Sequence, residues 1–270
     1  MSESDGFIRV AVFLVVILLL LACERLLPAR SGGTGKRQRW IANGVLFLLG
    51  IFATRLLGPL VAVNAAIWSS ERGTGLLNAF DISPAFELIM ALLLLDAAIY
   101  LQHWASHRLP LLWRLHRVHH ADNAIDVSTA LRFHPFEIAL SMLYKCFVVI
   151  AIGASWWAVL LFEVILNASA MFNHSNIRLP ARLDRNLRVL LITPSAHLIH
   201  HSTRHSQQHS NFGFCLSVWD RLFTTYRSPD REVIVSSGLQ GVGGERAQSL
   251  RWMILSPFTG AQSQAGDESR

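Results

Sequence analysis

The stretch HWASHRLPLLWRLHRVHH, residues 103–120, decides how this chain is organised. It holds two groups of histidines, His103-x3-His107 and His116-x2-His119-His120. Side chains spaced i, i+3 and i+4 share one face of a helix, so each group is expected to aim its imidazoles in one direction. The pair 109–110, Leu-Pro, breaks the helix and predicts that the two groups belong to separate elements. A third group repeats the second spacing further along the chain: His197-x2-His200-His201.

The composition indicates a membrane protein. Of the 270 residues, 52% are hydrophobic and only 16% are charged, which is too apolar for an ordinary soluble domain. The net charge of +6 is clustered in particular loops, so we interpret it as a topology signal and expect no nucleic-acid partner. Three cysteines, far apart and without a C-x-x-C, predict neither a disulfide framework nor a thiolate zinc site.

Apolar stretches predict an all-α, integral membrane helical bundle of about four to five spans. The stretches are 8–23, 40–68, 84–102 and 138–173, the last being a hairpin that turns near Gly153. We expect 8–23 to be an anchor, since no basic segment precedes it. Arg55 and Gly58-Pro59 interrupt 40–68, which is either one kinked span or a span followed by a re-entrant piece.

Basic residues predict the orientation. The segment 24–39 has five of them against Glu24, and the positive-inside rule makes it cytoplasmic. Counting spans from there puts the N-terminus outside and every histidine in a cytoplasmic helical cap. The loop that contains the first two histidine groups agrees, because it carries further arginines. The basic residues in these two regions are Arg25, Arg30, Lys36, Arg37, Arg39, Arg108, Arg114, Arg117 and Arg132.

Neutral imidazoles are good ligands for iron, zinc and copper, and three such groups can hold two metal ions. The H-E-x-x-H motif of zinc proteases and the Glu-x-x-His motifs of soluble di-iron bundles do not occur. An all-histidine di-metal site beside a bilayer suits oxygen chemistry on a lipid. A zinc-dependent membrane hydrolase and a histidine-rich metal transporter or store remain alternatives. A transporter would place its ligands near the midplane, whereas these histidines follow the ends of the spans.

The ordered motifs resemble the fatty acid hydroxylase/sterol desaturase superfamily. Asp96-x3-Tyr100-x2-His103-x3-His107 looks like its first motif and His116-x2-His119-His120 like its second. Further segments continue in family order: Asp126-Val127-x4-Arg132-Phe133-His134-Pro135-x-Glu137, Asn173-His174, the third histidine group, Asn211-Phe212-Gly213, Trp219 to Tyr226, Gly238-Leu239 and Pro257-Phe258. Trp104 departs from the pattern, because many members place Arg there.

The resemblance implies two non-haem iron ions, dioxygen and hydroxylation or desaturation of a hydrophobic substrate. It leaves open whether the lipid is a sterol, a carotenoid, a fatty acyl chain or an alkyl lipid. No haem-attachment or nucleotide motif is present, so a separate protein is expected to donate the electrons. The predicted metal ligands are His103, His107, His116, His119, His120, His174, His197, His200 and His201.

Five other residues lie near these motifs. His134 precedes Pro135 and is better explained as a helix boundary than as a ligand. His205 and His209 extend the third group, and we expect both to lie outside the coordination spheres. Asp96 and Glu137 are candidates for orienting a ligand histidine through its second ring nitrogen.

The organisation predicted from these features has three parts. Residues 1–83 form N-terminal spans and loops, 84–227 form the catalytic module with its membrane hairpin, and 228–270 form a C-terminal tail.

Overall fold

A computed structural model describes residues 3–31, 35–234, 236–242 and 244–259. Its described part is helical and contains no named strand, as predicted. The long helices are α1 (Glu3–Leu26), α2 (Lys36–Leu56), α4 (Pro84–Arg108), α6 (Pro135–Ile152) and α7 (Trp156–His174). The shorter ones are α3 (Ala62–Glu71), η1 (Leu77–Ala79), α5 (Pro110–His120), η2 (Val127–Leu131), α8 (Ala181–Leu187), α9 (Pro194–His200), α10 (His205–Gln208), α11 (Val218–Leu222), η3 (Pro229–Arg231), α12 (Gly244–Ala247), α13 (Leu250–Leu255) and η4 (Ser256–Phe258).

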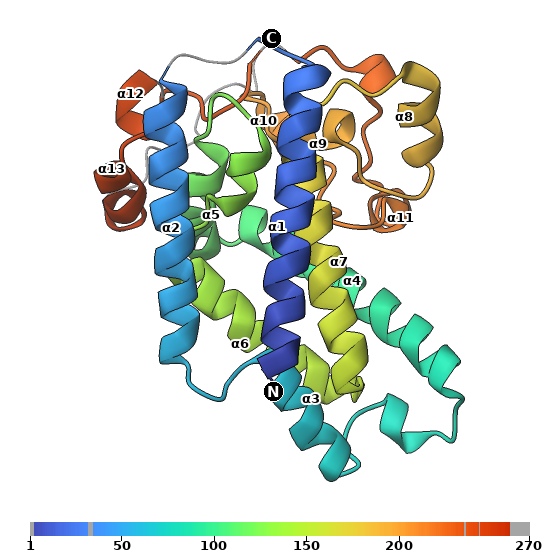
Figure 1. Ribbon diagram of the computed structural model, residues 1–270. Helices are drawn as coiled ribbons and strands as arrows, with labels where there is room; N and C mark the ends of the chain where they lie inside the picture. The colour runs from blue at the N-terminus through green and yellow to red at the C-terminus, as the bar shows by residue number, and fades with distance from the viewer. Residues whose placement is uncertain (1–2, 32–34, 235, 243, 260–270) are drawn as a thin grey trace.

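Within the described residues, five helices are long and apolar enough to cross a membrane, so this is a multi-pass membrane protein. They are Gly6–Leu26 of α1 together with α2, α4, α6 and α7. Figure 1 shows α1, α2 and α7 standing upright, with α8, α9 and α10 near the end of the bundle opposite α3. The helix α1 begins at the end of the bundle where α3 lies, and the short helices α8, α9 and α10 lie at the other end (Figure 1). The chain therefore crosses the bundle an odd number of times between the start of α1 and these helices.

The undecided stretch 40–68 is not one continuous span. The helix α2 ends at Leu56, and the separate α3 begins at Ala62. The break has a local cause, because Gly58 takes a left-handed φ of 60° and Pro59 disfavours helix in the residue before it. At about 1.5 Å per residue the ten residues of α3 are too short to cross, and Ala62, Val63 and Ala66 pack into the core.

Proline and glycine set the ends of the helices around the histidines. The helix α4 starts at Pro84, where the Ser83 hydroxyl accepts the Phe86 N–H. It continues past the predicted end at 102 as far as Arg108, because the next helix breaker is Pro110. His103 and His107 therefore lie in the last turns of a spanning helix. The predicted hairpin turns at Gly153, whose φ of 74° closes α6.

Two arginines counted as loop charges are buried instead. Arg39, 2% exposed, forms ion pairs with Asp122 and Asp126 and joins the start of α2 to the segment before η2. Arg132 is fully buried. They contribute to packing rather than to surface charge, so the charge signal in their loops depends on exposed residues such as Arg25, Lys36 and Arg37.

The C-terminal segment packs on the bundle over its described part. The Arg132 guanidinium donates to Oε1 of Gln248 at 2.7 Å and to the Ala247 carbonyl at 2.7 Å. Met253 of α13 is buried against Leu46 of α2 and Val118 of α5. Residues 260–270 of the predicted tail lie outside the described residues.

Candidate metal centre

Four elements end at one place in the interior, and each brings histidines to it. The last turns of α4 supply two, α5 supplies three, α7 supplies its final residue, and α9 with its C-cap supplies three. All nine are the predicted ligands, and none is more than 5% exposed. A buried cluster of this kind is unusual because imidazole is polar and needs a partner for each ring nitrogen.

The nine imidazoles form two groups. Within each group, one nitrogen of every histidine lies within 4.8 Å of the others. The five-histidine group consists of His103, His107, His116, His120 and His200. The four-histidine group consists of His119, His174, His197 and His201.

The second motif is divided between the two groups. His116 and His120, one helical turn apart, belong to the five-histidine group, whereas His119 belongs to the other. The expectation that one motif aims its imidazoles in a single direction is therefore wrong here. Adjacent residues on a helix diverge by about 100°, so His119 and His120 leave α5 in different directions.

The third motif is divided in the opposite sense. His197 and His201 join the four-histidine group, and His200 joins the five-histidine group. Each H-x-x-H-H motif thus supplies two imidazoles to one group and one to the other. A single short helix can in this way contribute to both groups.

Hydrogen bonds from the outer ring nitrogens fix the orientation of several imidazoles. Nδ1 lies within bonding distance of an oxygen in five cases: His103 with Phe212 O (2.6 Å), His116 with Glu137 Oε1 (2.6 Å), His119 with Arg132 O (3.3 Å), His174 with Ala170 O (2.6 Å) and His200 with Ser210 O (2.8 Å). Carbonyl and carboxylate oxygens only accept, so Nδ1 carries the proton. The lone pair on Nε2 then faces the interior of the group, as in metal-bound histidines.

The inner nitrogens face one another at short range. Nε2 of His103 lies 3.2 Å from Nε2 of His116, and Nε2 of His174 lies 3.0 Å from that of His119. With Nδ1 donating outward in these rings, the facing Nε2 atoms have lone pairs to offer and would repel each other in both contacts. Two nitrogens at about 2.1 Å from one metal ion would lie roughly 3.0–3.4 Å apart at octahedral to tetrahedral angles. A cation between them would turn the repulsion into attraction.

Other ring nitrogens in the cluster have no hydrogen-bond partner although they are buried. Both nitrogens of His107 and of His120 are in this state, and so is Nε2 of His200. Leaving a buried polar atom unpaired costs roughly 1–3 kcal/mol. All three belong to the five-histidine group, and coordination of a metal ion would satisfy one nitrogen of each ring. In the four-histidine group, Nδ1 of His197 and of His201 also has no partner.

Burial also sets the protonation state that coordination requires. It lowers the pKa of His119, His120, His197, His200 and His201 well below the ordinary value of 6.5. These imidazoles are therefore neutral at pH 7 and can offer lone pairs. Donor type, spacing and protonation all fit two histidine-bound metal ions, and that the nine histidines bind them stays a prediction.

The three secondary candidates lie outside the two groups. The side chain of His134 caps α6, with Nδ1 accepting the Phe136 N–H at 3.2 Å. The rings of His205 and His209 stack on each other at 4.1 Å in and beside the short helix α10. His209 approaches the cluster only as a ring neighbour of His107, with centroids 5.5 Å apart.

The two carboxylates proposed to orient ligands act differently. Glu137 contacts Nδ1 of His116, as a group that orients a ligand would. Asp96 contacts no histidine. Its carboxylate accepts the N–H groups of Cys215 and Leu216 and the indole N–H of Trp219 at 2.8 Å, so direct orientation of the first motif by Asp96 has no supporting contact.

Asp220 is a residue whose role the sequence did not reveal. Its carboxylate accepts the N–H groups of Phe212 and Gly213, both at 2.8 Å, and the Phe212 carbonyl faces His103. A Cβ at Gly213 would lie 2.9 Å from the same carboxylate, which explains the glycine. Both residues stand in motifs quoted from the sequence, but the spacing of those motifs does not indicate this contact.

Comparison with known proteins gives consistent matches. The family model described as Fatty acid hydroxylase matches residues 88–225. An ornithine lipid hydroxylase OlsE from Rhizobium tropici is 25% identical over 175 residues, 65% of this chain and 51% of that protein. Alkylglycerol monooxygenases from Homo sapiens and Caenorhabditis elegans are 26% and 28% identical over 53% and 52% of this chain, and 31% and 27% of their own lengths. This chain thus spans about half or less of these relatives, and no solved structure matches it.

Replacing a histidine of either group should remove metal, whereas replacing a histidine outside both groups should not. We expect His120→Gln and His201→Gln to lose bound metal and all turnover, because each sits within a group of convergent imidazoles. His205→Gln and His209→Gln are the matched controls and should keep wild-type metal content with at most a modest loss of activity. Metal analysis of protein purified without oxygen measures this. Equal metal loss in His205→Gln and His201→Gln would show that the assignment of the third motif is wrong.

Proposed function

Because the chain belongs to the fatty acid hydroxylase family, we propose that it is a membrane oxidoreductase that uses two non-haem iron ions and dioxygen to oxidise a lipid. The observation that carries the proposal is the pair of buried, all-histidine groups at the end of a membrane bundle. An unactivated C–H bond needs a redox metal and dioxygen, since side chains alone cannot break it.

The residues divide this work between them. The five- and four-histidine groups would each hold one iron ion, which when bound supplies the activation of dioxygen for removing hydrogen from a C–H bond. Glu137 holds His116, and the Phe212 carbonyl holds His103, so both imidazoles keep their lone pairs directed inward. Rigid orientation of ligands is the contribution that a protein makes to such a centre.

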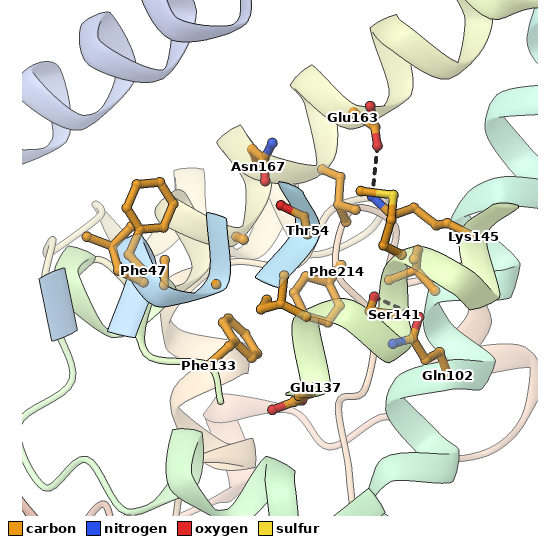
Figure 2. A pocket seen from close by; sticks show the side chains of 18 of the residues that line it. Phe47, Thr54, Gln102, Phe133, Glu137, Ser141, Lys145, Glu163, Asn167 and Phe214 are labelled. Atoms are coloured by element: carbon orange, nitrogen blue, oxygen red, sulfur yellow. Dashed lines mark hydrogen bonds and ion pairs between the residues drawn. The ribbon is translucent and has the colours of Figure 1, made fainter. Parts of the chain in front are cut away.

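A cavity of about 430 Å³ leads to the five-histidine group. His103 and His116 line its end, together with Glu137, Phe133 and Phe214. Figure 2 shows Phe133, Phe214 and Glu137 at this part of the cavity. The cavity lies among the spanning helices α1, α2, α4, α6 and α7, so a lipid chain could enter it from the bilayer. We infer that the substrate carbon approaches the five-histidine group rather than the other.

Hydroxylation is the outcome that we favour over desaturation. The relatives carry names of a lipid hydroxylase and of monooxygenases, which describe insertion of oxygen into those proteins' own substrates. Most residues that line the cavity are apolar, so the cavity suits a hydrocarbon chain better than a sugar or a peptide. The nature of the lipid is taken up below.

Two further parts of the proposal concern the surroundings. We propose that the histidine end of the bundle faces the cytoplasm, because Arg25, Lys36 and Arg37 are exposed at that end. We also propose that a separate protein donates the electrons, which fits a cytoplasmic metal centre.

The activity should be visible as a mass change in lipids. Membrane lipids of cells that express the protein should contain species heavier by about 16 Da, one oxygen atom, than those of cells without it. Cells with His120→Gln should resemble cells without the protein. A wild-type protein that leaves every lipid unchanged and binds zinc alone would contradict the proposal and favour the hydrolase.

Reporter fusions should reveal the orientation. A reporter that is active only outside the cytoplasm should be active after Gly73, between α3 and α4, and inactive after Gly33 and after Thr225. The charges flanking the first two spans give this order. Inverted results at all three positions would keep the bundle but put the metal centre outside the cell.

A further inference from the structure

The cavity that reaches the histidines has a charged end of its own. About two helical turns along α6 from Glu137, Lys145 lies at the wall beside Glu163 of α7 and Arg9 of α1. Nζ of Lys145 donates to Oε1 of Glu163 at 2.8 Å, and Arg9 forms an ion pair with Oε2 of the same carboxylate. Figure 2 shows the Lys145–Glu163 contact at the rim of the cavity, away from Phe133 and Glu137.

The charges at this end do not balance. Among the side chains that the structure describes, which begin at Gly6, two cations share one carboxylate, and this leaves one positive charge in excess in a part of the bundle made of spanning helices. Charge within a membrane span is costly and commonly marks a functional site. Glu137, another acid that lines the cavity, cannot neutralise it locally. It is eight residues away on α6, about 12 Å along the axis, and it is bound to His116.

The same cations have unused hydrogen-bonding capacity. Nε of Arg9 is buried and has no partner. The contact with Glu163 uses one of the three donors of the Lys145 ammonium group. Side chains of Thr54 and Asn167 add polar groups to the nearby wall. An oxyanion placed here would gain charge-assisted hydrogen bonds and would remove the excess charge.

Between the two ends the cavity is apolar. Phe47, Ile51, Ile138, Met142 and Leu166 form this part of the wall. The arrangement is that of a site for an amphiphile, with a polar group at one end, a hydrocarbon chain in the middle and the reacting carbon at the other end.

We propose that Arg9 and Lys145 bind an oxyanion, a carboxylate or a phosphate, carried by the lipid substrate. The anchored lipid extends its chain through the apolar part toward His103 and His116, so a carbon roughly 12 Å from the oxyanion is the one oxidised. This inference rests on the proposed function, because it names the class of lipid for that same site. A purely structural ion cluster would hold α1, α6 and α7 together without distinguishing between lipids.

Binding to metal-loaded protein, kept without dioxygen so that no turnover occurs, tests the anchor apart from the reaction. The probes are phosphatidic acid against diacylglycerol with the same chains, a free fatty acid against its methyl ester, and inorganic phosphate alone. The readout is the shift in thermal midpoint with lipid concentration, which gives the affinity. The anionic lipid of each pair should bind about 10- to 100-fold more tightly, the worth of one charged hydrogen bond, and inorganic phosphate should shift the midpoint little.

Variants then assign the preference to the cluster. Lys145→Met should abolish the preference and leave binding of the neutral lipids unchanged, because Glu163 keeps Arg9 as its partner. Lys145→Arg should retain the preference. Arg55→Met is the matched control, since Arg55 is an exposed cation of α2 outside the cavity, and it should change nothing.

The inference would be overturned by wild-type protein that binds both members of each pair equally, or by Lys145→Met protein that keeps the preference. Equal shifts by inorganic phosphate and phosphatidic acid would do so as well, because the site would then recognise a free anion. If Lys145→Met does not fold, the preference of the wild-type protein for the anionic lipid of each pair still tests the inference. If the preference is found and iron-loaded protein oxidises neither lipid, the proposed function fails and the anchor remains.

Discussion

The division of each H-x-x-H-H motif between two histidine groups constrains the rest of the structure. The helix α5 must present three imidazoles to two points, and α9 must do the same from the other side. Both points are completed by spanning helices, through the last turns of α4 and the final residue of α7. Because Nε2 atoms face each other at 3.0–3.2 Å, we expect metal binding to stabilise the fold of this end of the bundle.

Buried charges keep these elements in register. Arg39 of α2 pairs with Asp122 and Asp126 just after α5. Arg132 orients His119 through its carbonyl and reaches the C-terminal segment through its guanidinium, which stays protonated at pH 7 although burial lowers its pKa to about 10. Asp96 and Asp220 hold the loop around Phe212 from two sides. These side chains hold in place the segments around the histidine groups and belong to neither group.

The sequence predicted the parts of the fold that depend on local signals. Apolar runs, Pro110 and Gly153 gave the spans and their ends, and the histidine spacing gave the nine candidates. Motif spacing alone could not show that neighbouring imidazoles separate into two groups, because that depends on where α4 and α7 end. A charge count could not show that Arg39 and Arg132 are buried, since their acidic and backbone partners come from distant segments. The predicted contact of Asp96 with a histidine has no support for the same reason. The partners of its carboxylate lie 119 or more residues away in sequence, where motif spacing cannot indicate them.

The central claim is that two metal ions lie side by side, one in each histidine group. Anomalous diffraction at the iron absorption edge, from crystals of protein purified without oxygen, tests it most directly. The account predicts two peaks, one among His103, His107, His116, His120 and His200 and one among His119, His174, His197 and His201. A single peak, or a peak outside these two groups, would contradict it.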